Sequence, residues 1–485
     1  MNLWIAERLF RSCSERSASK LELCLIASTL PLQVGMSLTA NISCGRCPTC
    51  SFCWENFRSR RNRFSVSEFV RILFVHQNFP GQYVHIIQRL AQQGQHQLVA
   101  LGINALDRGR GMPESLTHFR YKLASGNTKG VHPLVMETES KIIRAEGCAR
   151  AAEQLKAKGF MPDLICAHPG WGEPLFLKAI WPDAPLLCYQ EFFYNEFGFD
   201  SNFDPEFQDE SSWQEQAKLT MKNAYLHLTL EQADWNVSPT HFQASSFPEH
   251  WRRKISVIHD GVDLQQACPH PSAAPLKLPD GTVLEKGQPI VTFVNRCLEP
   301  YRGCHTFIRA IPELQRQHPE ARIVVVGKTK GVSYGADCPD GEWGDRFLAE
   351  IKGQYDPSRV HFTGSLPYGQ FIPLLQLSAC HVYLTYPFVM SWSLLEAMGC
   401  GCAVVGSDTA PVREVIRHGQ NGVLVDFFSP TDLAAAVVEM LNDPERAAAF
   451  GVAARETVQR TYELNACVTR QLALMDLVAS RSIVA

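Results

Sequence analysis

From residue 71 onward, short apolar runs alternate with longer amphipathic stretches, and this alternation constrains the fold more than any other feature. The runs have the length of buried strands, and the stretches between them have the length and periodicity of helices. Strands and helices that alternate in this way form parallel sheets covered by helices. In the first half of the chain we expect strands at 72–76, 97–101, 164–167, 186–189, 235–238 and 255–258, and helices at 82–93, 139–158 and 214–232.

A second series of the same kind follows the turn at 260–263 and the proline-rich stretch 269–279, which is typical of a linker. Its expected strands lie at 290–295, 322–326, 360–362, 381–385, 403–406 and 423–425, and its helices at 306–318, 343–355, 371–377, 431–441 and 465–478. Two such halves predict a cleft between them, with ligands bound at the carboxyl ends of the strands.

The sequence therefore predicts a first Rossmann-like domain at 70–262, a second at 263–462, and a terminal helix and tail at 463–485. Residues 1–69 lack regular periodicity and contain cysteines at 44, 47, 50 and 53, a spacing that superficially suggests zinc or an iron–sulfur cluster. Because no histidine pair or second cysteine pair follows, we favour an extension outside the fold, with the folded chain starting at Val70.

The composition excludes several classes of protein. A net charge of −3 gives no general attraction to nucleic acid, and no run approaches the roughly twenty apolar residues of a membrane span. The cysteines beyond residue 69 mostly lie inside apolar segments, which is typical of a reducing cytosol.

The segment at 327–329 resembles the end of a phosphate loop, but Arg322 stands where the loop requires glycine. No G-x-G-x-x-G follows either first strand, and no Asp-x-Asp pair that would hold a metal on a diphosphate is present.

The block 387–422 carries the clearest chemical pattern. It reads as a loop, a helix whose one carboxylate is Glu396, a glycine and cysteine turn, and an apolar strand. Free backbone amides at a helix start can hold phosphates while an acidic side chain one or two turns further holds a ribose. Taken alone, Glu396 favours the simpler interpretation, a solvated residue on an ordinary helix.

Five segments carry a family resemblance, and they occur in order along residues 71–480: HQNFPGQY (76–83), HPGWGE (168–173), SVIHDGVD (256–263), NRCLEPYRG (295–303) and the block 383–422. The chain resembles the retaining glycosyltransferases of family 4. The resemblance implies the α/β fold called GT-B, with two facing Rossmann-like domains, parallel sheets, a cleft, and a C-terminal helix that crosses back to the first domain. The acceptor would bind to the first domain and the nucleotide-sugar to the second.

A nucleotide-sugar donor places definite demands on the second domain. Negative charge grows on the leaving diphosphate, and without a metal it must be stabilised by cations and helix N-termini. Arg296 and Arg302 stand where the family has an arginine and a lysine that grip the diphosphate, and arginine keeps the charge and adds forked donors. By resemblance, the amides of Ser391, Trp392 and Ser393 bind phosphate, and Glu396 holds the ribose hydroxyls. The family's first motif glutamate, which contacts the donor sugar near its 3-hydroxyl, is replaced by Phe388, which we interpret as a subgroup variation that leaves donor preference open.

In the first domain, Gly81 would allow the backbone to approach the phosphates closely. His168 matches the family histidine that faces the reacting sugar, although a lone histidine is more often structural. On the acceptor side the candidates are Glu191 and the aromatic Trp171, which could stack on a sugar ring.

The resemblance implies transfer of a hexose from a nucleotide diphosphate sugar to a glycan or lipid-linked acceptor, with retention of configuration. It implies no cofactor, no metal and no nucleic-acid partner. The family context points to surface polysaccharide or lipopolysaccharide assembly at the cytoplasmic face, with weak peripheral membrane contact. The alternatives are a non-catalytic nucleotide-sugar-binding protein and a nucleotide-sugar epimerase or phosphorylase on the same fold.

Overall fold

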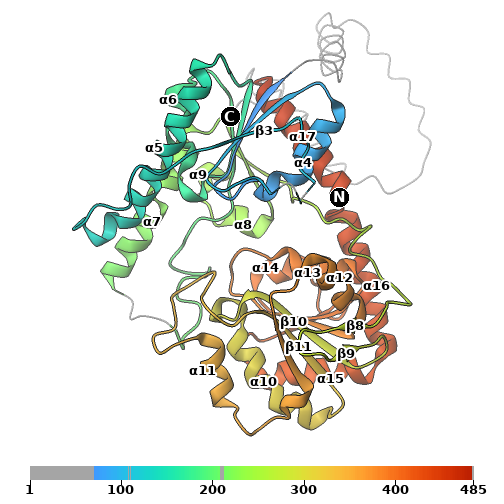
Figure 1. Ribbon diagram of the computed structural model, residues 1–485. Helices are drawn as coiled ribbons and strands as arrows, with labels where there is room; N and C mark the ends of the chain where they lie inside the picture. The colour runs from blue at the N-terminus through green and yellow to red at the C-terminus, as the bar shows by residue number, and fades with distance from the viewer. Residues whose placement is uncertain (1–69, 108, 110, 208–211, 483–485) are drawn as a thin grey trace, which may run out of the picture. The chain divides into compact units, whose positions relative to one another are not determined.

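The computed structural model describes residues 70–107, 109, 111–207 and 212–482, so the extension and the cysteine cluster expected within 1–69 lie outside the described residues. The first lobe is built on a seven-stranded sheet in the order β3-β2-β1-β4-β5-β6-β7, and every neighbouring pair is parallel. Figure 1 draws this lobe in blue to green. Its strands are β1 (Arg71–Val75), β2 (Gln97–Gly102), β3 (Thr117–Arg120), β4 (Leu164–Ala167), β5 (Leu186–Tyr189), β6 (Trp235–Ser238) and β7 (Ile255–Val257). Its helices are α4 (Val84–Gln93), α5 (Met136–Ala157), α6 (Leu177–Ile180), α7 (Trp213–Gln232), α8 (His241–Ser245) and α9 (Glu249–Arg252).

The second lobe contains a six-stranded parallel sheet in the order β12-β11-β10-β13-β14-β15. Its strands are β10 (Ile290–Cys297), β11 (Arg322–Lys328), β12 (Val360–Gly364), β13 (Cys380–Tyr383), β14 (Ala403–Ser407) and β15 (Val423–Val425). Its helices are α10 (Cys304–Gln317), α11 (Trp343–Glu350), α12 (Tyr368–Leu377), α13 (Trp392–Gly399), α14 (Ala410–Arg413), α15 (Pro430–Asn442) and α16 (Pro444–Thr461). The two parallel sheets confirm the predicted α/β class.

Several expected boundaries are wrong. The helix expected at 343–355 ends at Glu350, and the strand expected at 381–385 occupies Cys380–Tyr383. The proline-rich stretch is not only a linker, because it contains β8 (Leu276–Lys277), which pairs antiparallel with β9 (Val283–Leu284). Helix α16 and strand β3 were not expected at all.

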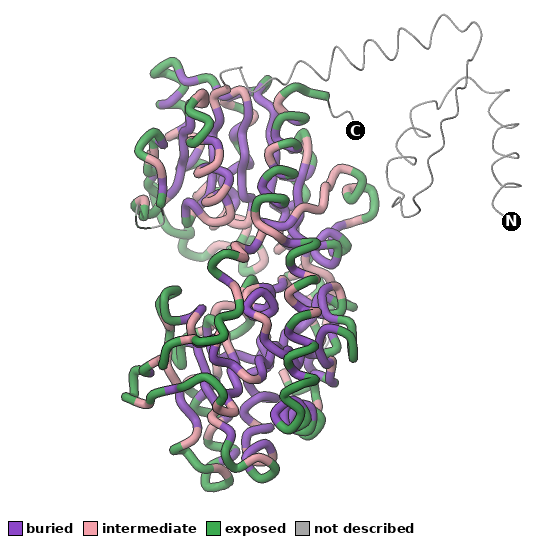
Figure 2. Tube along the Cα trace, turned by 90° about the vertical axis from the view of Figure 1, so that its right-hand side faces the viewer, coloured by how far each residue is buried: buried purple, intermediate pink, exposed green. Residues whose placement is uncertain are grey.

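The inner strands of both sheets are buried, which is why most of them read as apolar runs (Figure 2). In β1, Ile72 and Phe74 join the core on one face of the sheet, while Leu73 and Val75 join the core on the other. This alternation follows from the two-residue period of a strand.

The last helix, α17 (Leu464–Ala479), packs on the first lobe, as the resemblance implied. Leu474, Met475 and Val478 belong to the same core as Phe74. Where the chain crosses back to the first lobe, the Leu464 amide donates a hydrogen bond of 3.0 Å to the Val262 carbonyl.

Each sheet contains a point where the strand order reverses, between β1 and β4 in the first lobe and between β10 and β13 in the second. The loops leaving two such strands turn in opposite directions and open a crevice at their carboxyl ends. Segments quoted for the family resemblance begin at or near all four of these strand ends, those of β1, β4, β10 and β13.

Candidate active site

Two adjoining cavities lie at these strand ends. The α13 cavity, of about 510 Å³, is lined mainly by the loops after β10 and β13 and by the start of α13. The His168 cavity, of about 600 Å³, is lined mainly by the segments that follow β1, β4 and β5. The residues shared by both linings are Gln82, Glu191, Arg296, Tyr334, Val389 and Trp392.

The N-terminus of α13 opens into the α13 cavity. Ser391 caps the helix, since its hydroxyl accepts from the Ser393 amide at 3.3 Å, and its own amide donates to the Tyr383 hydroxyl at 2.8 Å. The amides of Val389, Met390 and Trp392 donate no hydrogen bond within the part of the chain that the structure describes. Free amides at the positive end of a helix form a site for an anion.

Arg302 places a buried positive charge beside these amides. Its Nη1 donates to Thr385 Oγ1 and to the Val389 carbonyl, both at 2.8 Å. The guanidinium carbon lies 5.0 Å from the centre of the Tyr334 ring and 5.9 Å from that of Phe388. Arg302 forms no ion pair with any described residue, so its charge is available to a ligand.

Tyr334 is held over Arg302 by Glu299, whose carboxylate accepts from the backbone amides of Ser333 and Tyr334. Burial raises the pKa of Glu299, although those amides and the nearby arginines oppose the shift. Sequence reasoning missed Glu299 and Tyr334, because neither carries a local signal of this arrangement.

Arg296 lies at the end of β10 with its side chain exposed on both cavities. Within the described residues it has no hydrogen-bond or ion-pair partner. Arg296 and Arg302 thus present two guanidinium groups to the same region, and neither forms an ion pair within 4 Å with a described residue.

Glu396 lies one helical turn beyond these amides, half-buried in the α13 cavity. Burial raises its pKa, and a hydrogen bond with Tyr368 acts in the opposite direction. Glu396 therefore lies near the free amides that are expected to bind phosphate, but on the next turn of the helix.

Asp260 is a residue of the α13 cavity that sequence reasoning missed. It is buried, and its Oδ2 accepts from the Tyr189 hydroxyl at 3.0 Å and from Trp392 Nε1 at 3.1 Å. Burial raises its pKa to about 7, even though both hydrogen bonds act to lower it. Asp260 stands in one of the segments quoted for the resemblance, but nothing in the sequence indicates that its carboxyl group is buried or that it joins the two lobes.

His168 ends β4 and is almost fully buried. Its Nδ1 accepts from the Gly170 amide at 3.1 Å, so in the neutral ring the proton resides on Nε2. Nε2 has no hydrogen-bond partner within the described residues, and it lies 3.7 Å from Glu191 Oε2. His168 therefore lines the cavity with an N–H donor that faces Glu191.

His76 supports this arrangement from the end of β1. Its ring lies 5.0 Å from the rings of His168 and Trp171. Burial and the neighbouring His168 lower the pKa of His76 to about 3, so it remains neutral. Gly81 has a φ of +53°, and a Cβ there would lie 2.3 Å from His76 Nε2. The glycine is thus required by the histidine ring as well as by its backbone conformation.

Glu191 lies where the two cavities meet. Burial would raise its pKa, but the nearby His168 ring and the charges of Arg296 and Arg302 outweigh it and lower the pKa. Glu191 is therefore ionised at neutral pH.

The structure brings all ten residues predicted from the sequence to the two cavities. Phe388, in place of the family glutamate, is buried and packs 4.8 Å from the Phe192 ring.

In the described residues no group of three or more histidine, cysteine, aspartate or glutamate side chains could hold a metal ion. No helix among them is long and apolar enough to cross a membrane.

Two Rossmann-like lobes with an anion site at the crevice define a protein of the GT-B class. Residues 94–267 match the family model described as glycosyl transferase family 4 group, and residues 277–457 match the one described as glycosyl transferases group 1. The chain belongs to this family of GT-B glycosyltransferases.

Similar proteins agree with this placement. A D-inositol 3-phosphate glycosyltransferase of Segniliparus rotundus is 26% identical over 45% of this chain and 47% of its own length. Anabaena HepE, solved with UDP and glucose, superposes with a TM-score of 0.58 at 16% identity, over 84% of this chain and 99% of its own. A sucrose-phosphate synthase of Thermosynechococcus elongatus gives 0.61 at 17% identity, over 85% and 100%. The matches to the first curated relatives span 40–47% of those relatives' lengths, and the structural likeness establishes the fold.

Proposed function

We propose that the protein transfers a hexose from a nucleoside diphosphate sugar to a glycan or lipid-linked acceptor, with retention of anomeric configuration. The observation that carries this proposal is the convergence of Arg296, Arg302 and the free amides before α13 on one cavity, with no carboxylate paired to either guanidinium in the described residues. A diphosphate supplies the negative charge that this arrangement requires.

The donor would lie across the two cavities. Its diphosphate would bind Arg296, Arg302 and the amides, and its ribose would reach Glu396. The sugar would occupy the shared region, where His168 Nε2 can donate to one of its hydroxyl groups. HepE was solved with UDP-glucose, and one relative in Mycolicibacterium smegmatis is a GDP-mannose-dependent mannosyltransferase, which supports UDP- and GDP-sugars as the first donors to test.

In the reaction, the bond between the anomeric carbon and the β-phosphate oxygen breaks, and its electron pair goes to the phosphate. The two guanidinium groups and the amides stabilise that charge, and no metal is required. The transition state has oxocarbenium character, and the ionised Glu191 lies on the side where positive charge develops. The acceptor hydroxyl attacks from the face that the phosphate leaves, and the departing phosphate oxygen takes its proton.

The test is release of nucleoside diphosphate from a panel of sugar donors, with and without glycan acceptors. Replacement of Arg296 or Arg302 by Ala should lower turnover by roughly a hundredfold or more. Arg346→Ala, an exposed arginine on α11 that lines neither cavity, is the control. NMR of the product's anomeric proton reports retention. Full donor turnover by Arg296→Ala would show that the diphosphate binds elsewhere.

Phe388 favours one second candidate, a nucleotide-sugar-binding protein without transferase activity. Its ring covers Arg302 where a family member has a carboxylate that contacts the sugar. A protein that binds a donor but neither transfers nor hydrolyses it with any acceptor would fit this candidate.

We propose a role in surface polysaccharide or lipopolysaccharide assembly at the cytoplasmic face on family context alone.

A further inference from the structure

The segment between β5 and α7 leaves the first lobe and docks on the second. Its residues 199–207, here called the connector, contain Phe203 and Phe207, which pack against the core of the second lobe, and Phe199, whose ring lies 5.9 Å from Phe192 and 5.3 Å from Phe242 of the first lobe. Phe203 lies 5.1 Å from the Tyr386 ring, and Phe207 lies 5.2 Å from His305. The connector therefore belongs to the first lobe by sequence and to the second by packing.

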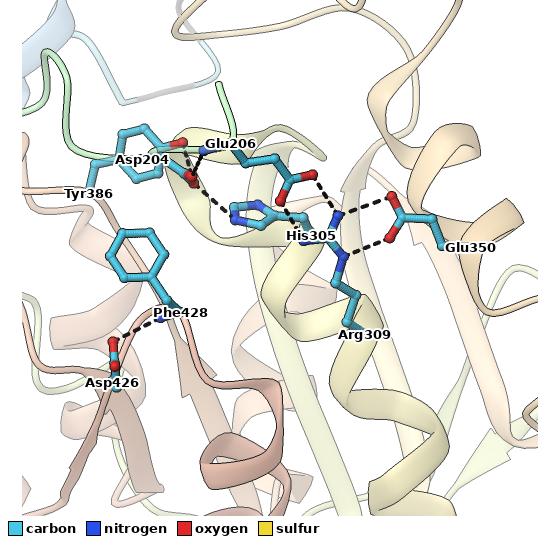
Figure 3. A network of polar contacts seen from close by, with 8 residues as sticks. All are labelled: Asp204, Glu206, His305, Arg309, Glu350, Tyr386, Asp426 and Phe428. Carbon is cyan, nitrogen blue, oxygen red and sulfur yellow. Dashed lines mark hydrogen bonds and ion pairs between the residues drawn. The ribbon is translucent and has the colours of Figure 1, made fainter. Parts of the chain in front are cut away.

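The connector also brings two carboxylates into the second lobe. Asp200 and Asp204 are each only 3% exposed. Buried carboxylates are costly unless they are hydrogen-bonded. Asp204 Oδ2 accepts from the Tyr386 hydroxyl at 2.8 Å and lies 3.1 Å from His305 Nε2, and Asp200 Oδ2 accepts from the Tyr301 hydroxyl at 3.1 Å (Figure 3 shows the Asp204 contacts). Burial would raise the pKa of Asp204, but the hydrogen bonds from His305 and Tyr386 outweigh it and lower the pKa, so the group is charged.

Tyr301 and Tyr386 are sequence neighbours of Arg302 and of one of its hydrogen-bond acceptors. Tyr301 directly precedes Arg302, and Tyr386 directly follows Thr385, whose hydroxyl accepts from Arg302. The two tyrosine rings lie 4.7 Å apart, and the Tyr386 amide donates to the Tyr301 carbonyl at 2.9 Å. Tyr386 is therefore linked through the backbone to Thr385, one of the two acceptors of Arg302, and by a hydrogen bond to Tyr301, the residue before Arg302.

A second ion pair on the connector offers a built-in comparison. Glu206 accepts two hydrogen bonds from Arg309, at 2.6 and 2.7 Å, and Glu350 accepts from the same guanidinium on the opposite side (Figure 3). Arg309 lies on α10, and neither it nor Glu206 lines either cavity. This ion pair therefore holds the connector on α10 without a hydrogen bond to Tyr386, Thr385 or Arg302.

We propose that Asp204 is a positioning residue of the diphosphate site: from the connector it fixes Tyr386, and through Tyr386 and Thr385 it fixes the Arg302 guanidinium. The inference rests on the proposed function, because it assumes that Arg302 binds the donor diphosphate. Asp204 touches no part of the α13 cavity and acts only through other residues.

The experiment is calorimetric titration of the full chain with UDP and with GDP. Tyr386→Phe removes one hydroxyl and keeps the ring, and Asp204→Asn keeps the shape of the side chain. Each should weaken binding about tenfold, the usual effect of losing a hydrogen bond to a charged group. Glu206→Gln should stay within about twofold of wild type, as expected for a partly exposed ion pair.

A double-mutant cycle separates positioning from a general loss of structure. If Asp204 acts through Arg302, the effects of Asp204→Asn and Arg302→Lys should be strongly non-additive, since residues in one network couple. Additive effects, wild-type affinity in Tyr386→Phe, or an equal loss in Glu206→Gln would each overturn the inference. If the wild-type chain bound neither nucleotide, the proposed function itself would fail; normal wild-type binding with unaffected variants refutes the inference alone.

Discussion

Asp260 gives the sharpest test of how burial controls the chemistry at the crevice. Its carboxyl group lies under Tyr189 and Trp392, and burial raises its pKa from 3.8 to about 7. The perturbation is Asp260→Asn, which keeps the shape and an acceptor oxygen but removes the titration.

The sign follows from proton binding. Between about pH 4 and pH 7 the folded state holds a proton on Asp260 that the unfolded state has lost, so stability falls as pH rises through this window. A difference of about three pH units at 1.36 kcal/mol each gives about 4 kcal/mol in all. Of this, about 2–3 kcal/mol is lost between pH 5 and pH 8.

The assay is urea unfolding of wild type and Asp260→Asn from pH 5 to pH 8, followed by tryptophan fluorescence. The difference between their free energies of unfolding should change by about 2–3 kcal/mol in favour of the variant as pH rises. Asp263→Asn, the same change in the same turn, is the control. Parallel pH curves for wild type and Asp260→Asn would refute the reasoning.

Three further predictions concern the site. His168→Gln should lower kcat by about a hundredfold while the Kd for UDP or GDP changes little, because His168 lies beside the region proposed for the sugar and not beside that proposed for the nucleotide; a loss confined to nucleotide affinity would contradict this. Gly81→Ala should destabilise the protein by about 1–3 kcal/mol through the clash with His76, measured as a lower Tm. Gly94→Ala, with a φ of +73° but open space, should cost only about 1 kcal/mol, and an equal cost at both positions would rule out the clash. Glu396→Gln should weaken nucleotide binding about tenfold, with little further loss for the 2′-deoxynucleotide, whereas equal discrimination between the two by wild type and variant would place the ribose elsewhere.

The strands show what local sequence can predict. β4, β5 and β15 occupy the predicted residues, since a strand buried on both faces is commonly a short continuous apolar run. β6 also occupies the predicted residues, although two of its buried residues, Asn236 and Ser238, are polar. β3 was missed because it lies at the edge of its sheet and no residue of it is buried. The helix predicted at 343–355 was too long, because the residues after Glu350 form turns but keep the amphipathic spacing of a helix.

The site shows the same division. The resemblance identified residues that reach the two cavities, because each stands at a strand end or helix start whose place in a parallel sheet is fixed by topology. It did not identify Asp260, Glu299, Tyr334 or the connector.

The sequence by itself determined the order of strands and helices and the chemical groups at their ends, because periodicity and turn residues act within a few positions. Only the tertiary structure decided which groups meet across long separations, such as Asp204 with Tyr386 and Asp260 with Trp392. Burial, hydrogen-bond partners and pKa depend on those distant neighbours, since the cost of burying a charge is set by what surrounds it in space.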